Sequence, residues 1–340
     1  MAGGQYGDCT SGRFFVMRVL IVGTGSIGRR HIRNLQALVD QPQFIFMRDS
    51  ARRDALSDEM DATVVGTFEA AIALRPELAV IATPSIRHLD ALLALLPAHI
   101  PCYVEKPVVA TEEQAKLLER LLGGLSACPA TLVGCNLRHL PSLQRVRGLL
   151  QSGAIGQPVR ASFQVGQWLP DWRPAQDYRL SYSADPGRGG GVALDLVHEF
   201  DAARWLFGEF DQVFAVGGHY SRLEIGSEDS ATILLGRTGG PAVAVGLDYV
   251  ARQPMRRYEI IGDEGTLVWD LVGRRLEHAS PNGNELIDCG EAGFETAATY
   301  VTAMTKMLAA VRSRQPTSQD IVDGLCSVRL ALNVNHQLRS

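Results

Sequence analysis

Short apolar runs alternate with amphipathic stretches over the first 135 residues. Buried strands are predicted where an apolar run of three to six residues ends at a turn-forming or polar residue. These runs lie at 17–22, 43–47, 63–65, 78–82, 102–104 and 131–134. Helices are predicted between them at 26–39, 51–60, 68–73, 86–96 and 111–122. Strands and helices that alternate at this spacing predict a doubly wound parallel sheet of the Rossmann type.

The pattern changes after about residue 137. Closely spaced strand-like runs follow a helix predicted at 192–207, and glycine-rich turns such as Gly239-Gly240-Pro241 separate them. Two further helices are predicted at 296–314 and 319–337. Such spacing is typical of a mostly antiparallel open sheet with helices, so the second half is expected to be a separate α/β domain. We therefore predict a flexible N-terminal tail at 1–16, a Rossmann domain at 17–137 and the second α/β domain at 138–340.

Composition excludes several classes of protein. The 340 residues are 46% hydrophobic with a net charge of −4, which argues against a disordered chain and against a nucleic-acid-binding surface. The longest apolar stretches fall short of the roughly 18–20 residues that a membrane helix needs. The six cysteines are scattered and form no CxxC pair, so neither a disulfide framework nor a metal site is expected. We expect a cytoplasmic protein without a membrane or nucleic-acid partner.

A glycine motif links the first strand to the first helix. The motif is Gly23-Thr24-Gly25-Ser26-Ile27-Gly28, and it has the GxGxxG spacing of a dinucleotide-binding turn. The first glycine permits the tight turn, the second lets a pyrophosphate approach the backbone, and the third lets the helix pack on the strand. A glycine-rich turn without a ligand is the alternative. The position between strand and helix favours a dinucleotide site.

The end of the second strand bears on the choice of cofactor. An acidic residue at this point usually binds the ribose 2′-hydroxyl of NAD, but the expected position holds Met47, followed by Arg48. A guanidinium can pair with the 2′-phosphate of NADP, so we favour NADP(H) over NAD(H), with Arg48 and Ser50 as contacts. Asp49 could still bind the ribose if the strand runs longer, and NAD(H) remains open.

Polar residues follow two further strands, where parallel sheets bind ligands. Thr83, Pro84 and His88 follow the strand at 78–82, and Glu105 and Lys106 follow the strand at 102–104. The chain has three lysines among its 33 basic residues, so a lysine next to an apolar strand is informative. The ammonium of Lys106 could polarise a substrate oxygen or stabilise negative charge during hydride transfer. An ordinary surface lysine is the alternative.

A third motif opens the helix predicted at 192–207. Three glycines, 189–191, precede Asp195 and His198, which are three residues apart and would share one face of a helix. A histidine beside a carboxylate can accept and return a proton near neutral pH. Asp195, in the first helical turn, is expected to stay ionised. A helix cap with a structural histidine is the alternative for an isolated pair.

Together these motifs resemble the Gfo/Idh/MocA oxidoreductases, which act on sugars, cyclitols and related compounds. The residues that carry the resemblance are the 23–28 motif, Ala82-Thr83-Pro84 with His88, Glu105-Lys106-Pro107, the 189–201 stretch, Asn136 and Arg138 with Pro141, 152–156 and 262–266. The resemblance implies Lys106 as catalytic lysine, Asp195 and His198 as an acid–base pair, Asn136 at the cofactor and Arg138 at the substrate. It also implies a substrate-binding second domain whose sheet forms a dimer or tetramer. Many members place the Asp and His four apart, which makes His198 the firmer assignment.

A long aromatic and polar segment, 167–182, precedes the glycine run. Long loops of this kind are often functional, so we predict that this one covers the substrate. The candidate contacts in it are Arg173, Tyr178, Arg179 and Tyr182. An arm that stabilises an oligomer is the alternative.

These features predict reversible hydride transfer between a nicotinamide and a hydroxyl or keto carbon. The substrate is expected to be a sugar or nucleotide sugar, and a role in bacterial surface-polysaccharide synthesis is predicted. A non-catalytic NAD(P)-binding regulator and an NAD-recycling hydrolase or lyase remain alternatives; a scaffold protein has the least support.

Overall fold

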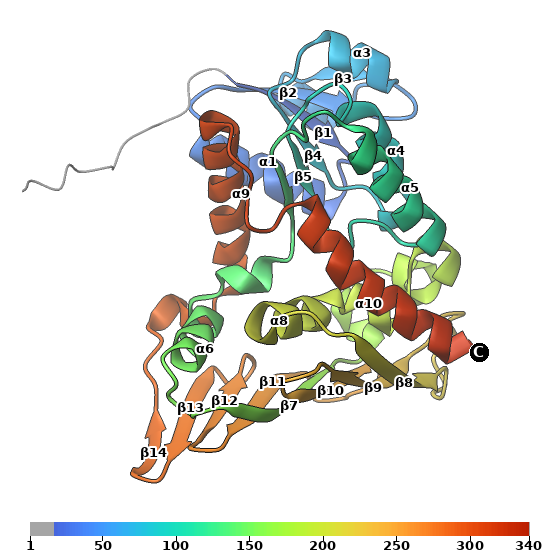
Figure 1. Ribbon diagram of the computed structural model, residues 1–340. Helices are drawn as coiled ribbons and strands as arrows, with labels where there is room; N and C mark the ends of the chain where they lie inside the picture. The colour runs from blue at the N-terminus through green and yellow to red at the C-terminus, as the bar shows by residue number, and fades with distance from the viewer. Residues whose placement is uncertain (1–16, 340) are drawn as a thin grey trace, which may run out of the picture.

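The computed structural model describes residues 17–339, in two sheets with helices around and between them (Figure 1). The predicted tail at 1–16 lies outside the described residues. The first sheet has six parallel strands in the order β3-β2-β1-β4-β5-β6. Its strands are β1 (Met17–Val22), β2 (Pro42–Met47), β3 (Thr63–Val65), β4 (Leu78–Ile81), β5 (Cys102–Val104) and β6 (Thr131–Val133). The predicted Rossmann sheet is therefore confirmed.

Alternate side chains of β1 enter two cores, one on each face of this sheet. Val19 and Ile21 pack with α1 and α9, whereas Leu20 and Val22 lie on the side of α4. Each strand has apolar residues on both faces because helices cover both faces, so it appears in the sequence as a continuous apolar run. The helices that connect these strands are α1 (Ser26–Leu38), α2 (Ala55–Glu59), α3 (Phe68–Ala73), α4 (His88–Leu95) and α5 (Glu112–Gly124).

The second sheet has eight strands in the order β14-β13-β12-β11-β7-β10-β9-β8. Of the strand pairs described in this sheet, only β7–β10 is parallel, which confirms the predicted mostly antiparallel sheet. The strands are β7 (Pro158–Gly166), β8 (Gln212–Gly218), β9 (Ser230–Gly236), β10 (Ala242–Asp248), β11 (Met255–Gly262), β12 (Thr266–Asp270), β13 (Arg275–Ser280) and β14 (Gly283–Leu286).

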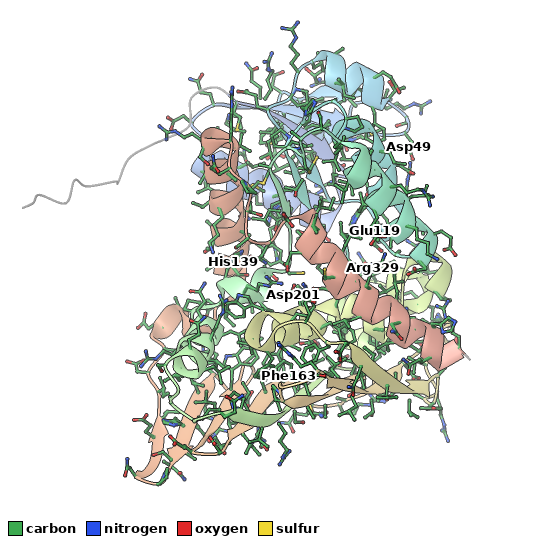
Figure 2. The ribbon with its side chains drawn as sticks, viewed as in Figure 1. Asp49, Glu119, His139, Phe163, Asp201 and Arg329 are labelled. Carbon is green, nitrogen blue, oxygen red and sulfur yellow. The ribbon has the colours of Figure 1, made fainter. Side chains whose placement is uncertain are left out.

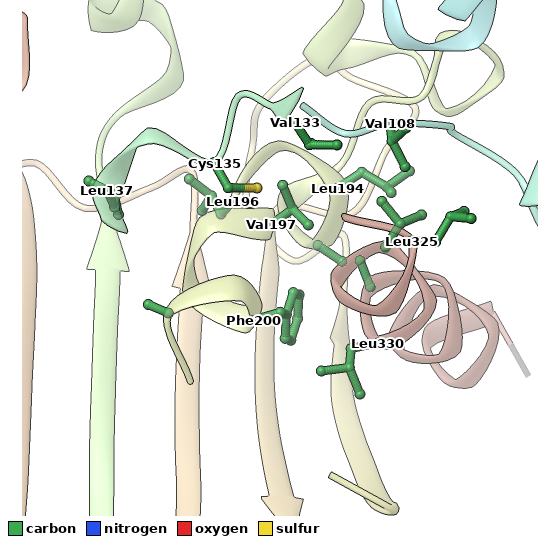
Figure 3. Close-up of a cluster of buried hydrophobic side chains, with 14 of the residues drawn as sticks. Val108, Val133, Cys135, Leu137, Leu194, Leu196, Val197, Phe200, Leu325 and Leu330 are labelled. Atoms are coloured by element: carbon green, nitrogen blue, oxygen red, sulfur yellow. The ribbon is translucent and has the colours of Figure 1, made fainter. Parts of the chain in front are cut away.

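Helices of the second half fill the space between the two sheets (Figure 1). They are α6 (Pro141–Gln151), α7 (Val192–Asp195), α8 (Val197–Phe207) and α10 (Ile321–Arg339). Figure 3 shows side chains of α8 and α10 in one apolar cluster with Val108 and Val133. Val108 lies in the segment after β5, and Val133 is the last residue of β6, so both belong to the Rossmann half. One continuous apolar core therefore joins the two halves and holds their facing edges together.

The last part of the chain returns to the first sheet. Helix α9 (Thr296–Ser313) packs on α1, and its Met304 and Met307 are fully buried in the Rossmann core. The unit around the first sheet thus includes a helix from the end of the sequence. Among the described residues, no helix is long and apolar enough to cross a membrane.

Two helix predictions are wrong in their extent. The helix predicted at 192–207 is broken at Leu196, whose φ of −99° and ψ of 29° separate α7 from α8. The helix predicted at 51–60 begins only at Ala55, because Asp54 forms a capping box with Ser57 there. The first break changes the site, since Asp195 ends one helix and His198 lies in the first turn of the next.

Candidate active site

The glycine turn after β1 is shaped by close backbone contacts. Gly23 has a φ of +97°, and a Cβ on it would lie 2.8 Å from the backbone of Ala82 and Thr83. A Cβ on Gly28 would lie 2.1 Å from the carbonyl oxygen of Gly23. A Cβ on Gly25 would meet nothing within 4 Å. Gly23 and Gly28 are therefore required by close packing of the backbone, whereas Gly25 leaves open space in front of the backbone.

Helix α1 offers its N-terminus to this open space. Gly25 is its N-cap without a side-chain hydrogen bond, and its first turn, which holds Ser26 and Ile27, contains no acidic residue. Free backbone N–H groups and the helix dipole make such an end a site for a phosphate group. A pocket of about 170 Å³ beside it is lined by Gly23, Thr24 and Thr83, among others. These residues fit the pyrophosphate of a dinucleotide.

Two residues that follow β2, Arg48 and Asp49, also line this pocket. The Nη1 atom of Arg48 lies 2.9 Å from Asp54 Oδ1, whereas its Nε and Nη2 are buried without a hydrogen-bond partner among the described residues. Asp49 also lines the pocket and accepts two hydrogen bonds from Arg87. Ser50 is exposed in the following turn, where its Oγ accepts a hydrogen bond from the Arg52 N–H. One nitrogen of the guanidinium on which the NADP(H) prediction depends is thus paired with a carboxylate, and the other two have no partner in the described part of the chain.

The residues after β4 and β5 are fixed by buried polar contacts. The two ring nitrogens of His88 lie 2.9 Å and 3.0 Å from the carbonyl oxygens of Thr83 and Pro107, so His88 ties the two strand ends together. Pro84 precedes the 3₁₀ turn between β4 and α4. Glu105 Oε1 lies 2.6 Å from Nε2 of His31 on α1, a partner that the sequence analysis missed. His88 and Glu105 thus orient the loops on either side of Lys106.

Lys106 bridges the two halves of the molecule. Its Nζ donates a 2.7 Å hydrogen bond to the carbonyl oxygen of Asp195, the last residue of α7. Lys106, Asp195 and His198 all line one pocket of about 290 Å³. The structure therefore brings Lys106 together with Asp195 and His198, which lie in the other half of the chain and were also selected for their chemistry.

The carboxylate of Asp195 is held by tyrosines. Tyr249, directly after β10, donates a 2.6 Å hydrogen bond to its Oδ2, and the Oδ1 atom is buried without a partner among the described residues. The charge of Asp195, together with burial, raises the pKa of Tyr182, and burial followed by Asp195 raises the pKa of Tyr249. Both phenols therefore stay protonated at neutral pH.

His198 is a buried, neutral imidazole. Burial lowers its pKa well below the usual value, and the positive charges of Lys106 and Arg256 lower it further. Its Nδ1 is buried without a hydrogen-bond partner among residues 17–339, and the residue lines the pocket. A neutral imidazole is a proton acceptor, so this arrangement suits a general base.

Arg256 lines the pocket and Glu199 lies buried behind it; neither residue was singled out from the sequence. Arg256 on β11 lines the pocket, and its Nε lies 2.8 Å from Oε1 of the fully buried Glu199. Tyr258 donates a 3.1 Å hydrogen bond to the same oxygen. Glu199 follows His198 directly and could have been noticed for that reason, but its partners on a distant strand give no local sign in the sequence.

Several predicted contacts lie outside this pocket. Arg138 forms a buried bidentate pair with Asp201, and Asn136 donates to Thr299 Oγ1. In the 167–182 segment, Arg179 pairs with Asp177 and Glu224, the Tyr178 hydroxyl accepts from the Glu224 N–H, and Arg173 lies over the Tyr182 ring. From this segment Gln167 and Trp172 line the pocket instead.

Two models of one family match the chain over most of its length. Residues 17–126 match the oxidoreductase family with an NAD-binding Rossmann fold, and residues 143–268 match the GFO/IDH/MocA C-terminal domain. The chain therefore belongs to the Gfo/Idh/MocA family of oxidoreductases, with an NAD-binding Rossmann domain.

Individual relatives agree with this assignment. An inositol 2-dehydrogenase of Streptomyces avermitilis is 28% identical over 208 residues, which cover 57% of this chain and 54%, about half, of the relative. One of Rubrobacter xylanophilus is 25% identical over 94% of this chain and 90% of the relative. A solved oxidoreductase from Agrobacterium radiobacter, in complex with NAD⁺, L-tartaric acid and magnesium, has a TM-score of 0.81 at 22% identity, covering 95% of this chain and 96% of the other. That likeness shows a shared fold.

Proposed function

We propose that the protein is an NAD-dependent dehydrogenase that interconverts a secondary hydroxyl and a keto group on a sugar or cyclitol. The observation that carries this proposal is the pocket in which Lys106, Asp195 and His198 meet. A regulator that only senses the cofactor needs neither a buried neutral imidazole nor an ammonium at the same pocket. The names of the relatives, inositol 2-dehydrogenases, support a polyhydroxylated substrate.

The nicotinamide, when bound, supplies the hydride acceptor or donor. The chain's own residues hold the cofactor through the 23–28 turn and the N-terminus of α1. Lys106 Nζ, fixed by the Asp195 carbonyl, donates a hydrogen bond to the reacting oxygen and stabilises its developing negative charge. His198 accepts the hydroxyl proton in oxidation and returns it in reduction. Asp195, held by Tyr249, keeps Lys106 and the start of α8 in place.

The remaining walls of the pocket suit a small polar ring. Gln167, Asp248 and Arg256 offer hydrogen-bonding groups, and Trp172 offers an apolar surface. A volume of about 290 Å³ lies at the small end of ligand pockets, which favours a free monosaccharide or cyclitol over a nucleotide sugar. A role in surface-polysaccharide synthesis stays a prediction.

We propose NAD(H) rather than NADP(H) as the cofactor. The Asp54 carboxylate, 2.9 Å from Arg48 Nη1, offsets the charge of that guanidinium and would lie close to a 2′-phosphate bound there. Asp49 lines the same pocket and can accept a ribose hydroxyl. Titration of the nicotinamide fluorescence tests this choice: NADH should bind at least about tenfold more tightly than NADPH. Tighter binding of NADPH would restore the role predicted for Arg48.

We also propose that the open face of the second sheet forms an interface between copies of the chain. Phe214 and Val216 on β8 and Leu234 on β9 are 63%, 74% and 47% exposed, and they lie on neighbouring strands. Exposed apolar side chains that cluster on one face mark interaction surfaces. Sedimentation analysis should show a dimer or tetramer that Val216→Glu dissociates; a monomeric wild-type protein would contradict this.

The dehydrogenase proposal is tested by turnover. The purified protein with NAD⁺ is screened against inositols and free sugars by nicotinamide absorbance, and the best substrate is used for Lys106→Met and His198→Ala. Each variant should lose at least about 10²-fold in kcat, while NADH affinity changes little. Matched controls are Lys116→Met and His336→Ala, which alter exposed side chains. Near-normal turnover in either active-site variant would remove its assigned role.

A further inference from the structure

A second pocket of about 290 Å³ lies apart from the candidate active site. It is bounded by the segment after β6, by α6, by Trp205 on α8 and by Lys306 on α9. It shares no lining residue with the pocket of Lys106 and His198. Figure 2 labels His139, which lines it, at the lower end of α9. None of the residues that line this pocket is an Asp or a Glu, whereas Arg and Lys are prominent among them.

Positive charge in this pocket is only partly balanced. Arg138 is neutralised by Asp201 and Asp323, whose carboxylate oxygens lie 2.6 Å and 2.8 Å from its Nη2. Lys306 and Arg147, by contrast, have no carboxylate within 4.0 Å among residues 17–339. Arg147 lies over the Trp205 ring at 4.7 Å. Two cations thus line one pocket without a protein counter-charge.

His139 adds a hydrogen-bond donor without a partner. Lys306 Nζ lies 3.2 Å from His139 Nδ1, and because an ammonium group can only donate, Nδ1 must accept. Burial, Lys306 and Arg138 lower the pKa of His139 to about 4, so the ring is neutral at pH 7 and carries its hydrogen on Nε2. His139 is 4% exposed, and its Nε2 has no acceptor in the described part of the chain. An unpaired buried donor of this kind is costly unless a ligand satisfies it.

The presence of a lysine at position 306 also points to a ligand, because lysine is rare in this chain. The chain uses arginine for 30 of its 33 basic residues, since Lys106, Lys116 and Lys306 are its lysines. Lys116 pairs with Glu112 at 3.4 Å, whereas Lys306, although exposed, has its Nζ against the buried His139 and no carboxylate beside it among residues 17–339. A lysine supplies a compact point charge and rotatable donors, which suit a phosphate group beside an arginine.

We propose that this pocket binds the phosphate group of a small metabolite, through Lys306, Arg147 and His139 Nε2. A phosphate monoester carries a charge of about −1.5 to −2 at pH 7, which matches the two unpaired cations, whereas a single carboxylate would leave one of them unbalanced. The site is separate from the dinucleotide pocket, so its ligand is bound in addition to the cofactor. Because Trp205 belongs to α8, the ligand contacts the helix that carries His198.

The test is calorimetric titration of the full-length protein in phosphate-free buffer with saturating NADH, so that the N-terminus of α1 is occupied. The titrants are inorganic phosphate, glucose 6-phosphate and glucose. We expect saturable binding of both phosphates, with an affinity that stays the same when glucose is present in excess. Lys306→Met and Arg147→Gln should each weaken it at least about tenfold. Lys306→Arg, which restores the charge, should bind within a few-fold of wild type, and Lys116→Met should be unchanged.

Three results would overturn the proposal. The first is no saturable binding of either phosphate to the wild-type protein. The second is binding that persists in both Lys306→Met and Arg147→Gln. The third is binding that is lost in Lys106→Met, which would place the anion in the candidate active site instead. Arg147→Gln keeps the test valid if Lys306→Met does not fold, since Arg147 is partly exposed.

Discussion

The buried ion pair between Arg138 and Asp201 allows a quantitative test of how α8 is held. Asp201 is 1% exposed and accepts hydrogen bonds of 2.8 Å and 2.6 Å from Arg138, and one of 3.0 Å from Ser327 on α10. Asp201 thus joins α8 to the segment after the Rossmann sheet and to the last helix. Asp201→Asn keeps the shape of the side chain but removes the charge that neutralises Arg138.

The expected loss of stability is large. Removing one partner of a buried ion pair costs about 3–5 kcal/mol, because the other charge stays buried without compensation. Asp323 remains 2.8 Å from Arg138 Nη2 and is only partly buried, so we expect the lower end, about 3 kcal/mol. A double variant, Asp201→Leu with Arg138→Met, should recover part of this loss, because it removes both charges.

Urea unfolding followed by circular dichroism measures the effect. Lys116→Gln is the matched control, since it breaks an exposed pair with Glu112 at 3.4 Å and should cost less than about 0.5 kcal/mol. We also expect a lower kcat for Asp201→Asn, because α8 carries His198. A loss below about 1 kcal/mol for Asp201→Asn would refute the view that this pair fixes α8.

Two further predictions concern the cofactor turn and the base. Gly25→Ala should weaken NADH binding at least about tenfold with unchanged stability, whereas Gly28→Ala should also destabilise the fold by about 1–3 kcal/mol because its Cβ would meet the Gly23 carbonyl. Equal stability losses, measured by thermal unfolding, would contradict this distinction. Arg256→Gln should raise the pKa of His198, since it removes a positive charge that lowers it. The acidic limb of the kcat/KM profile for oxidation should therefore move to higher pH; an unmoved limb would mean that His198 is not the base.

Much of the fold follows from local patterns. The Rossmann strands are buried on both faces, so they appear as continuous apolar runs between helices. The second sheet alternates in burial, as in Ala231, Ile233 and Leu235 of β9, because one face packs on helices and the other is open. Lys106 could be selected because lysine is rare in this chain, and the glycine turn because its position between strand and helix is specific.

The remaining features depend on contacts between distant segments. Leu196 continues the apolar pattern of its neighbours, so nothing in its local sequence marks the break between α7 and α8. Arg256 looks like any polar strand residue until the fold places it beside Glu199. Arg138 was expected at the substrate, but its guanidinium is bound by Asp201 and lines the phosphate pocket proposed here. The roles of Arg256 and Arg138 depend on ion pairs with residues far away in the sequence. Such pairs cannot be recognised from the residues around either arginine.

The central claim is that Lys106 and His198 act on one substrate carbon next to the nicotinamide. A crystal structure of the complex with NADH tests it most directly. We expect the nicotinamide ring at the pocket that Lys106, Asp195 and His198 line, with Lys106 Nζ and His198 Nε2 both facing the space in front of its C4 atom. A nicotinamide ring outside this pocket, or one with the two side chains on opposite faces, would contradict the account.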